Sequence, residues 1–318
     1  MRLVTLDDIR AAQRRIAGVA VRTPLLPCPW ADGGRPLWLK PESLQPTGAF
    51  KVRGATNAIA ALPGEARVRG VVTDSSGNHA QAVAYAARLH GIAAVVVMPD
   101  VAPEVKIAAT RALGAEVVLV PPAERGAAAA EIAQRGGYAY IAPFDHPDVV
   151  AGQGTVGLEI ADDAAELDTV LVPVSGGGLI SGVATAVKSL RPGVTVVGVE
   201  PELAADAQES LRRGELVSWE PSRTYRTIAD GLRMGLSDLT WAHVSAYVDD
   251  IVTVSEDEIL EAVRVLATRA RLVAEPSGAV TAAAYLFHRD ALPAGRHHVA
   301  VVSGGNVDPA LLARLLGA

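Results

Sequence analysis

The chain has 318 residues, of which 50% are hydrophobic and 20% charged, so it is long enough for one large domain or two smaller ones. Its net charge of −6 gives it no electrostatic reason to bind nucleic acid or an anionic membrane. The first residues lack a signal-peptide core, and the longest apolar stretch, residues 92–98, is too short to span a bilayer. The single cysteine, Cys28, excludes an internal disulfide and fits a reducing compartment. We therefore expect a cytoplasmic protein without nucleic-acid or membrane partners.

The predicted elements begin with a helix at residues 6–17, for which Thr5 is the expected N-cap. A proline-rich stretch follows, and then a short strand at residues 37–40. From there, short apolar runs alternate with alanine-rich helical segments. The further strands are expected at residues 70–73, 93–98, 116–120, 169–174, 194–199, 247–254 and 298–302. The helices between and after them are expected at residues 78–89, 103–113, 125–134, 179–190, 256–270, 277–287 and 309–316.

This alternation predicts an α/β fold with parallel sheets covered by helices, because the apolar runs lack the period-two pattern of a half-exposed strand. Two sheets are favoured over one, since residues 70–147 contain three or four strand–helix units and the chain after Ala151 contains another set. Ligands of such sheets bind at the carboxyl ends of the strands. The loops that follow the strands are therefore the places to look for chemistry.

The first unusual loop is PTGAFKVRG at residues 46–54, in which Lys51 begins an apolar helical run that ends near Ala61. A charged lysine is costly to bury on the apolar side of a helix. That cost is avoided if the amine is neutral or bound as an imine, which is how proteins hold carbonyl cofactors. Considered alone, the loop is explained better by a surface lysine beside Arg53.

The second loop is SSGNH at residues 75–79, directly between a predicted strand and a predicted helix. Backbone N–H groups at a helix N-terminus attract anions, so a carboxylate or a phosphate would fit there. The alternative is an ordinary N-cap made by Ser75 or Ser76.

The third loop is SGGGL at residues 175–179, again between a strand and a helix. Three glycines allow a phosphate to approach the backbone closely. The spacing of Gly176, Gly178 and Gly182 differs from the dinucleotide fingerprint, and no acidic ribose partner is evident about twenty residues later. The loop therefore predicts a site for a single phosphate rather than a dinucleotide, with a simple tight turn as the alternative.

Two further strand ends carry weaker signals. SGGN at residues 303–306 places a hydroxyl beside two glycines, where it could hydrogen-bond a flat ring, but alone it is only a turn signal. Glu200 and Asp206, with a carbonyl between them, offer oxygen ligands to a hard divalent cation. A solvated acidic helix start explains that acidic pattern about as well.

Together these loops resemble the fold-type II pyridoxal-phosphate (PLP) enzymes, most closely the serine/threonine dehydratase and serine racemase branch. The resemblance covers nearly the whole chain, from Lys40 to Asp308. The stretches that carry it are KPESLQPTGAFKVRGA (40–55), SGNHAQ (76–81), GQGT (152–155), SGGGL (175–179) and SGGNVD (303–308). It implies a tryptophan-synthase-β-like fold of two parallel-sheet α/β domains with PLP between them. Residues 1–69 and 148–318 would form the large PLP-binding domain, and residues 70–147 a small mobile domain.

The resemblance also implies roles for the cofactor residues. Lys51 would hold PLP as a Schiff base and then act as the base at Cα, while Ser303 would face the pyridine nitrogen. The other cofactor-binding residues would be Phe50, Asn78, Ser175, Gly176, Gly177, Gly178, Leu179 and Glu275. A neutral hydroxyl opposite the ring nitrogen weakens the electron sink and favours β-elimination over transamination.

The same resemblance implies a substrate site and a cation site. The substrate-binding residues would be Ser75, Ser76, Gly77, Asn78, His79 and, on weaker grounds, Arg125. The ligands of Mg²⁺ or another divalent cation would be Glu200, the carbonyl of Ala204, and Asp206. The partner would be a small amino acid, and the family is often homodimeric.

The implied reaction is loss of water from L-serine- or L-threonine-type β-hydroxy amino acids, which gives a 2-oxo acid and ammonia. Ser76 departs from the alanine that dehydratases often carry and matches the racemase-like members, so it is a second expected catalytic residue. Ala49 and Ser175 are smaller departures from a common serine and a common first glycine. The alternatives are a serine- or aspartate-type racemase with elimination as a side activity, and a 3-hydroxyaspartate or phenylserine dehydratase. A non-catalytic binding protein and a nicotinamide oxidoreductase are less favoured.

Overall fold

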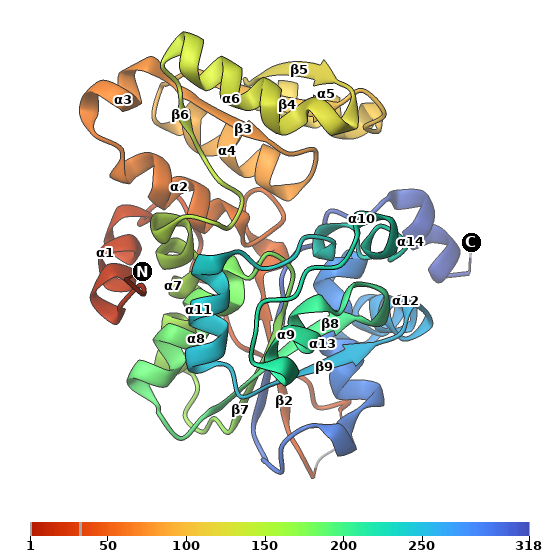
Figure 1. Cartoon of the computed structure of the whole chain (residues 1–318). Coiled ribbons are helices and arrows are strands. Elements are labelled where there is room, and N and C mark those ends of the chain that lie inside the picture. Colours follow the sequence, from red (N-terminus) through yellow and green to blue (C-terminus); the bar gives the residue numbers. More distant parts are fainter. Residues whose placement is uncertain (1, 32–33, 318) are drawn as a thin grey trace.

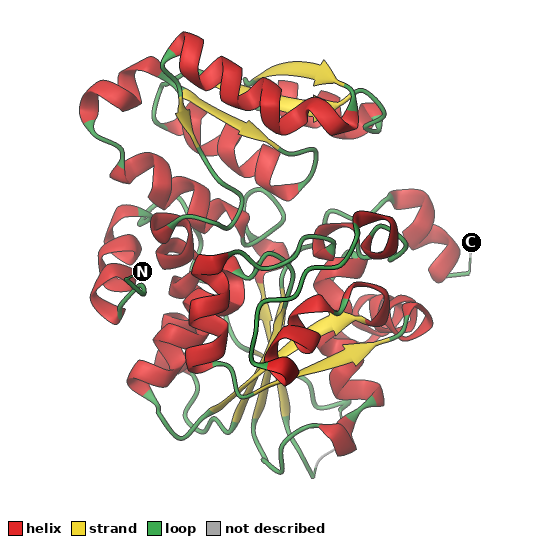
Figure 2. Ribbon diagram, in the orientation of Figure 1, coloured by secondary structure: helices red, strands yellow, loops and turns green. Residues whose placement is uncertain are grey.

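The computed structural model describes residues 2–31 and 34–317, which form two parallel-stranded sheets, each covered by helices (Figures 1 and 2). The larger sheet has the strand order β1-β2-β10-β7-β8-β9, and the smaller sheet has the order β5-β4-β3-β6. All pairings are parallel except the one between β1 and β2. The predicted α/β fold with two sheets is confirmed.

The strands of the larger sheet come from both ends of the chain. They are β1 (Leu26–Pro27), β2 (Leu37–Pro41), β7 (Thr169–Pro173), β8 (Thr195–Pro201), β9 (Asp250–Val254) and β10 (His298–Val302). On one face they pack against α8 (Gly178–Leu190), which in turn contacts α7 (Pro147–Asp163) and α11 (Asp238–Tyr247). On the other face they pack against α13 (Pro276–Phe287), α12 (Glu256–Val265) and the π-helix η5 (Leu266–Ala270). Apolar β-branched strands buried on both faces form this core.

The smaller sheet is contiguous in sequence and consists of β3 (Val71–Asp74), β4 (Ala94–Pro99), β5 (Glu116–Val120) and β6 (Ala139–Tyr140). Helix α6 (Arg125–Gly136) covers one face, while α4 (Asn78–Leu89) and α5 (Glu104–Ala112) cover the other. Helix α2 (Lys51–Ala61) packs against both α4 and α7, so it connects the two halves of the molecule. The proposed boundaries at residues 69/70 and 147/148 remain a prediction.

The remaining elements are short or lie at the ends of the chain. They are α1 (Leu6–Arg15), α3 (Gly64–Arg69), α9 (Asp206–Arg213), α10 (Pro221–Thr224), α14 (Pro309–Leu315), and the single 3₁₀ turns η1 (Glu42–Leu44), η2 (Pro122–Glu124), η3 (Glu202–Ala204), η4 (Asp230–Leu232) and η6 (Arg289–Ala291). Thr5 caps α1 in a capping box with Asp8, as its sequence predicts. Among the helices within residues 2–31 and 34–317, none has both the length and the apolar character that a membrane span needs.

Three predictions from the sequence need correction. The strand expected at residues 247–254 begins only at Asp250, because Tyr247 is the last residue of α11. The helix expected at residues 256–270 is α-helical only to Val265 and then widens into the π-helix. Strand β5 is not buried on both faces, since it is the edge strand of the smaller sheet and several of its residues are exposed.

A buried ion network joins α2 to α7 and β2. The guanidinium of Arg53 donates to both oxygens of Glu42 at 2.7 and 2.8 Å and to both oxygens of Glu159 at 2.7 and 2.9 Å. Lys40 Nζ donates to Glu159 at 2.6 Å. Two positive and two negative side chains therefore balance, and all four are at most 4% exposed. Burial alone lowers the pKa of Arg53, but the two adjacent carboxylates raise it overall.

Candidate active site

Lys51 begins α2, and the residue before it, Phe50, contacts Ser303 just beyond the carboxyl end of β10. Its Nζ donates to the carbonyl oxygen of Pro143 at 2.7 Å and lies 5.2 Å from the ring centroid of Phe50. Burial lowers the pKa of the Lys51 amine to about 8. A surface lysine would keep its ordinary pKa near 10.5, so the alternative of a solvated Lys51 is not supported.

Segments from both sheets meet beside this lysine. The backbone N–H of Phe50 donates to the carbonyl of Ser303 at 3.0 Å, which joins the start of α2 to the end of β10. Asn78 Nδ2 donates to Glu275 Oε1 at 2.6 Å, which joins α4 to the N-cap of α13. Ser303 is 4% exposed, and its hydroxyl donates at 3.4 Å to the backbone carbonyl of Ser277. Burial and then the charge of Asp230 raise the pKa of Glu275 to about 7.

The loop at residues 75–79 leads from β3 into α4. Gly77 is the N-cap of α4, no side chain caps the helix, and the Ser75 hydroxyl only accepts from the Gly77 N–H at 3.3 Å. The alternative of a serine N-cap is therefore wrong. His79 is 3% exposed and its Nε2 donates to the carbonyl of Ile141 at 3.0 Å. Burial, and next the charge of Lys51, lower the pKa of His79 to about 3, so its imidazole is neutral.

The glycine-rich loop lies between β7 and the N-terminus of the 13-residue helix α8. Gly177 has a φ of +83° in the left-handed region, which side chains rarely adopt. Within the described chain, the backbone N–H groups of residues 176–179 donate to no backbone carbonyl, although these four residues are buried. Unpaired donors at a helix N-terminus form a site for an anion such as phosphate.

Phe144 connects the glycine loop to Lys51, and sequence reasoning missed it. A Cβ placed on Gly176 would lie 2.3 Å from the Phe144 ring, and one on Gly178 would lie 3.0 Å from the Phe144 Cβ. The residue before it is Pro143, whose carbonyl accepts from Lys51. Only glycine at these positions allows the ring to lie against the loop. The available signal was weak, because Phe144 follows a two-residue strand.

Known proteins resemble this chain over almost its full length. A model of the family described as "Pyridoxal-phosphate dependent enzyme" matches residues 16–304. The chain belongs to this family. It is 46% identical to an L-threonine ammonia-lyase of Thermotoga maritima over 99% of this chain and 78% of the relative. It is 40% identical to an L-threo-3-hydroxyaspartate ammonia-lyase of Saccharomyces cerevisiae over 98% of this chain and 96% of the relative. The structure of maize serine racemase superposes with a TM-score of 0.94, at 39% identity, over 98% of this chain and 97% of the maize chain.

The residues of this member of the PLP-dependent family fit its cofactor. The unpaired N–H groups of residues 176–179 suit the phosphate, and the amine of Lys51, with its lowered pKa, suits the aldehyde. Asn78 and Ser303 meet at the same junction as Lys51, and each carries a group that can hydrogen-bond a ring substituent. Contacts thus connect Phe50 with Ser303 and Asn78 with Glu275, and residues 143–144 connect Lys51 with the glycine loop; the role of these residues in binding the cofactor remains a prediction.

Two predicted substrate residues lie on the side of the smaller sheet. Ser76 is half-buried in the middle of the loop that precedes α4. Arg125 begins α6 and its Nε donates to the carbonyl of Pro122 at 3.3 Å. Arg125 is close enough to Tyr140 for its positive charge to oppose the rise that burial causes in the pKa of that phenol. The Tyr140 hydroxyl donates to Asp74, the residue immediately before the loop at residues 75–79. Arg125 thus lies near the start of the loop at residues 75–79, and a contact of either with a substrate remains a prediction.

The two predicted carboxylate ligands of a cation lie at and after the carboxyl end of β8: Glu200 is the second-last residue of the strand, and Asp206 begins α9. Glu200 accepts from the backbone N–H groups of Ala207 at 3.2 Å and Gln208 at 2.7 Å. Glu200 is 1% and Asp206 4% exposed, with the buried Ala204 between them in sequence. Burial, and then the charge of Asp206, raise the pKa of Glu200 well above its usual value. Among the described residues, no three or more His, Cys, Asp or Glu side chains cluster as metal ligands, and the predicted set contains only two carboxylates and a carbonyl.

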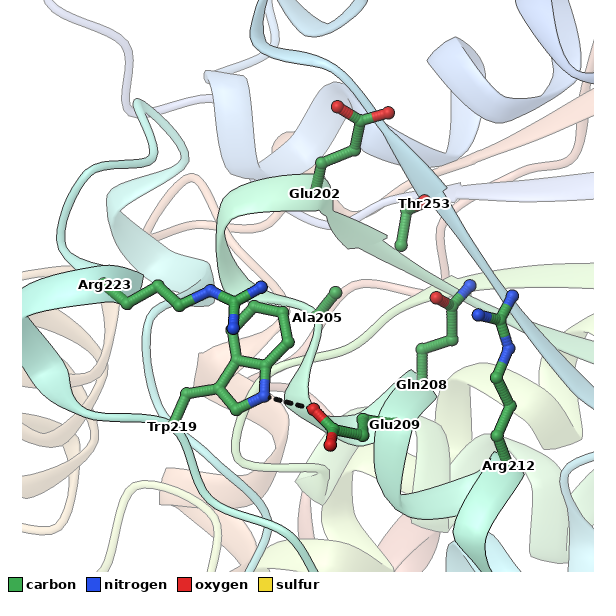
Figure 3. Close-up of a pocket in the computed structure, with 8 residues that line it drawn as sticks. All are labelled: Glu202, Ala205, Gln208, Glu209, Arg212, Trp219, Arg223 and Thr253. Carbon is green, nitrogen blue, oxygen red and sulfur yellow. Dashed lines mark hydrogen bonds between the residues drawn. The ribbon is translucent and has the colours of Figure 1, made fainter.

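A surface cavity of about 450 Å³ is lined in part by residues that neighbour Glu200 and Asp206 in sequence (Figure 3). Its lining residues are Glu202, Ala205, Gln208, Glu209, Arg212, Trp219, Arg223 and Thr253. Trp219 Nε1 donates to Glu209 at 2.6 Å, and the Arg223 guanidinium lies 3.0 Å from the Trp219 ring centroid. Trp219 thus contacts both a carboxylate and a guanidinium of the wall, and none of the predicted cofactor, substrate or cation residues lines this cavity.

Proposed function

We propose that this chain is a PLP-dependent ammonia-lyase that removes water from small L-β-hydroxy amino acids such as L-threonine and L-serine. The observation that carries the proposal is the junction of Lys51, Asn78 and Ser303 beside the unpaired N–H groups of residues 176–179. Two relatives that share 40% or more of its residues over nearly the whole chain are ammonia-lyases. The products would be a 2-oxo acid and ammonia.

In this proposal, different segments of the chain bind different parts of the cofactor. Residues 175–179 bind the phosphate through backbone N–H groups, and Lys51 holds the cofactor through its amine. Asn78 would donate to the 3′ oxygen and Phe50 would pack against the ring, while Glu275 accepts from Asn78. Ser303 offers a neutral hydroxyl to the ring nitrogen. When bound, PLP supplies the electron sink that stabilises negative charge at the substrate's Cα.

The protein would move protons and exclude water around that carbon. Once the amino group of the substrate has displaced Lys51 from the cofactor, the freed amine, with a pKa of about 8, can be neutral near physiological pH and so remove the Cα proton. The loop at residues 75–79 would bind the substrate carboxylate through its N–H groups. The neutral imidazole of His79, hydrogen-bonded to Ile141, holds this loop against the segment that leads to Pro143.

Racemisation is the second candidate function, and Ser76 is the residue that favours it. Reprotonation of Cα from the face opposite Lys51 requires a proton donor on that face, and a hydroxyl at position 76 provides one. The TM-score of 0.94 with maize serine racemase supports this alternative. A serine- or aspartate-type racemase, or a 3-hydroxyaspartate or phenylserine dehydratase, would use the same cofactor residues.

Three further properties belong to the same proposal. A divalent cation such as Mg²⁺ would bind Glu200, the Ala204 carbonyl and Asp206, since within the described chain neither buried carboxylate forms an ion pair. The protein would form a homodimer, for which the exposed apolar side chains of Leu44 and Val273 are candidate contacts. It would work in the cytoplasm, where its only thiol stays reduced; burial raises the pKa of Cys28 to about 12, which makes it unreactive.

The test is a keto-acid release assay with L-serine, L-threonine, L-threo-3-hydroxyaspartate and phenylserine, with Mg²⁺ and with EDTA. We expect release from at least one substrate, and an absorbance band near the visible edge that borohydride or Lys51→Ala removes. A purified protein that shows no such band after addition of PLP would contradict the proposal. Chiral analysis of the remaining amino acid then separates elimination from racemisation.

A further inference from the structure

A chain of side-chain hydrogen bonds leads from a backbone carbonyl to the amide of Asn78. Asn306 Nδ2 donates to the carbonyl oxygen of Thr47 at 2.9 Å and to Asn78 Oδ1 at 2.7 Å. Asn78 Nδ2 then donates to Glu275 Oε1 at 2.6 Å. The four residues come from four different segments: the loop before α2, the loop after β10, the start of α4 and the N-cap of α13.

The carbonyl oxygen of Thr47, the first acceptor in this series of hydrogen bonds, fixes the direction of every later bond. A backbone carbonyl can only accept, so Asn306 must turn its NH₂ group toward Thr47. The second hydrogen of that group points to Asn78, which must therefore present its oxygen to Asn306. The NH₂ group of Asn78 is then on the side of Glu275. One of its two N–H groups serves Glu275, and the other is left for a further acceptor.

The carbonyl that starts the chain is held in place by the backbone around it. The Gly305 N–H donates to the carbonyl of Gly48 at 2.8 Å, and a β-bridge joins Ala49 to Gly304. Gly48 has a φ of +72°, and a Cβ there would lie 2.4 Å from Asn306 Oδ1. Asn306 itself is exposed, so these contacts and not burial determine the position of its amide.

We propose that Asn306 is a positioning residue that fixes which end of the Asn78 amide faces the 3′ oxygen of the bound cofactor ring. The inference rests on the proposed function, in which Asn78 donates to that oxygen. If the Asn78 amide turned over, its oxygen would face the ring oxygen, which is an acceptor, and Asn78 would lose the bond that its NH₂ group donates to Glu275. The bond from Asn306 prevents this, because a turned amide would present a second NH₂ group to the NH₂ group of Asn306.

The experiment compares two aldehydes that differ only at the ring oxygen: PLP and 3-deoxypyridoxal 5′-phosphate. Cofactor-free protein is titrated with each, and the dissociation constant is measured from absorbance and fluorescence. For Asn306→Ala we expect roughly tenfold weaker binding of PLP, the size of one or two lost hydrogen bonds, and a change of under about twofold for the 3-deoxy compound. Asn306→Asp keeps the shape but loses the donor, and should behave in the same way.

Double variants then test whether Asn306 acts through Asn78. Adding Asn306→Ala to Asn78→Ala should leave the affinity for PLP unchanged, because the amide to be positioned is absent. A matched control is Thr268→Val, which loses a 2.8 Å bond from a side chain to the backbone carbonyl of Arg264, away from this junction. It should leave both affinities as they are.

Several outcomes would overturn the inference. They are equal weakening for both aldehydes, additive effects in the double variant, and wild-type affinity for PLP in Asn306→Ala. Thermal unfolding of each variant shows whether a loss of affinity reflects loss of the fold, which would also weaken the 3-deoxy compound. Failure of the proposed function has a different signature, since wild-type protein would then form no Lys51-dependent band with PLP at all.

Discussion

The amine of Lys51 lies 2.7 Å from the carbonyl oxygen of Pro143, a contact with a neutral acceptor rather than with a carboxylate. A carbonyl can orient an ammonium group but adds no full negative charge, so it offsets only part of the cost of burial. This explains why the pKa of Lys51 falls to about 8. The next residue, Phe144, lies against Gly176 and Gly178, so two consecutive residues contact the amine and the loop that is predicted to bind the phosphate.

The reactivity of this amine should follow its pKa. In cofactor-free protein we expect the rate of reaction with PLP to rise with pH and to level off above about pH 8, rather than near pH 10.5. The Lys51 amine holds its proton more tightly in the unfolded chain, where its pKa is near 10.5, than in the folded protein. The free energy of unfolding should therefore increase as pH rises from about 8 to 10.5. Lys51→Met serves as the control and should lose both dependences. A rate that still rises steeply at pH 10 would contradict the lowered pKa.

A substitution at Gly177 tests whether residues 175–179 bind the phosphate of PLP. We expect Gly177→Ala to weaken PLP binding at least tenfold, because the residue has a φ of +83° and a Cβ there would lie 2.5 Å from Leu236. The measurement is equilibrium titration with PLP and with pyridoxal, which lacks the phosphate; the loss should be larger for PLP. Gly193→Ala is a matched control, since nothing lies within 4 Å of its Cβ position. Equal losses for both ligands would show a folding defect instead.

Ser76 decides between elimination and racemisation in the proposed function. We expect Ser76→Ala to reduce the yield of D-serine from L-serine by tenfold or more while keto-acid release continues, because only the second face of Cα loses its proton donor. The measurements are chiral product analysis and exchange of the Cα hydrogen in deuterated solvent. Ser76→Thr, which keeps the hydroxyl, is the control. An unchanged D-serine yield in Ser76→Ala would remove Ser76 from the mechanism.

The buried network around Arg53 should dominate the stability of the junction between α2 and α7. Arg53→Met leaves the carboxylates of Glu42 and Glu159 buried without their main partner, and we expect it to cost about 3–5 kcal/mol of unfolding free energy. Urea denaturation measures this loss. Arg135→Ala, at an exposed pair with Glu131, is the control and should cost under about 0.5 kcal/mol. Similar losses in the two variants would be incompatible with a closed network.

The proposed cation should raise thermal stability through Glu200. A site saturated at about one hundred times its dissociation constant adds about 2.7 kcal/mol, so Mg²⁺ should raise the Tm and EDTA should lower it again. Glu200→Gln should abolish this response, because it removes a buried ligand charge. Glu202→Gln changes an exposed carboxylate two residues away and should keep the response. Identical Tm values with Mg²⁺ and with EDTA in wild-type protein would exclude the site.

The sequence by itself determined the alternation of strands and helices, the two sheets and the loops that hold the candidate cofactor residues. These features are local: an apolar run of β-branched residues, a glycine in the left-handed region and a lysine at a helix start depend on neighbouring residues. The 17-residue helix α7 was missed, because its glycines and buried polar residues disguise a helical pattern. Its glycines have a packing role instead, since Gly152 lies against the backbone of Gly54.

Only the tertiary structure decided which groups meet around those loops. Pro143, Phe144 and Asn306 are distant in sequence from Lys51 and Asn78, and their types carry no signal on their own. The Pro143 carbonyl can offset the cost of burying the Lys51 amine only when the fold brings the two within hydrogen-bond distance. In the same way, the Asn306 amide can orient Asn78 only when the two side chains are in contact. The chemistry of the site was therefore readable from the chain, whereas its orientation depends on contacts between segments that only folding brings together.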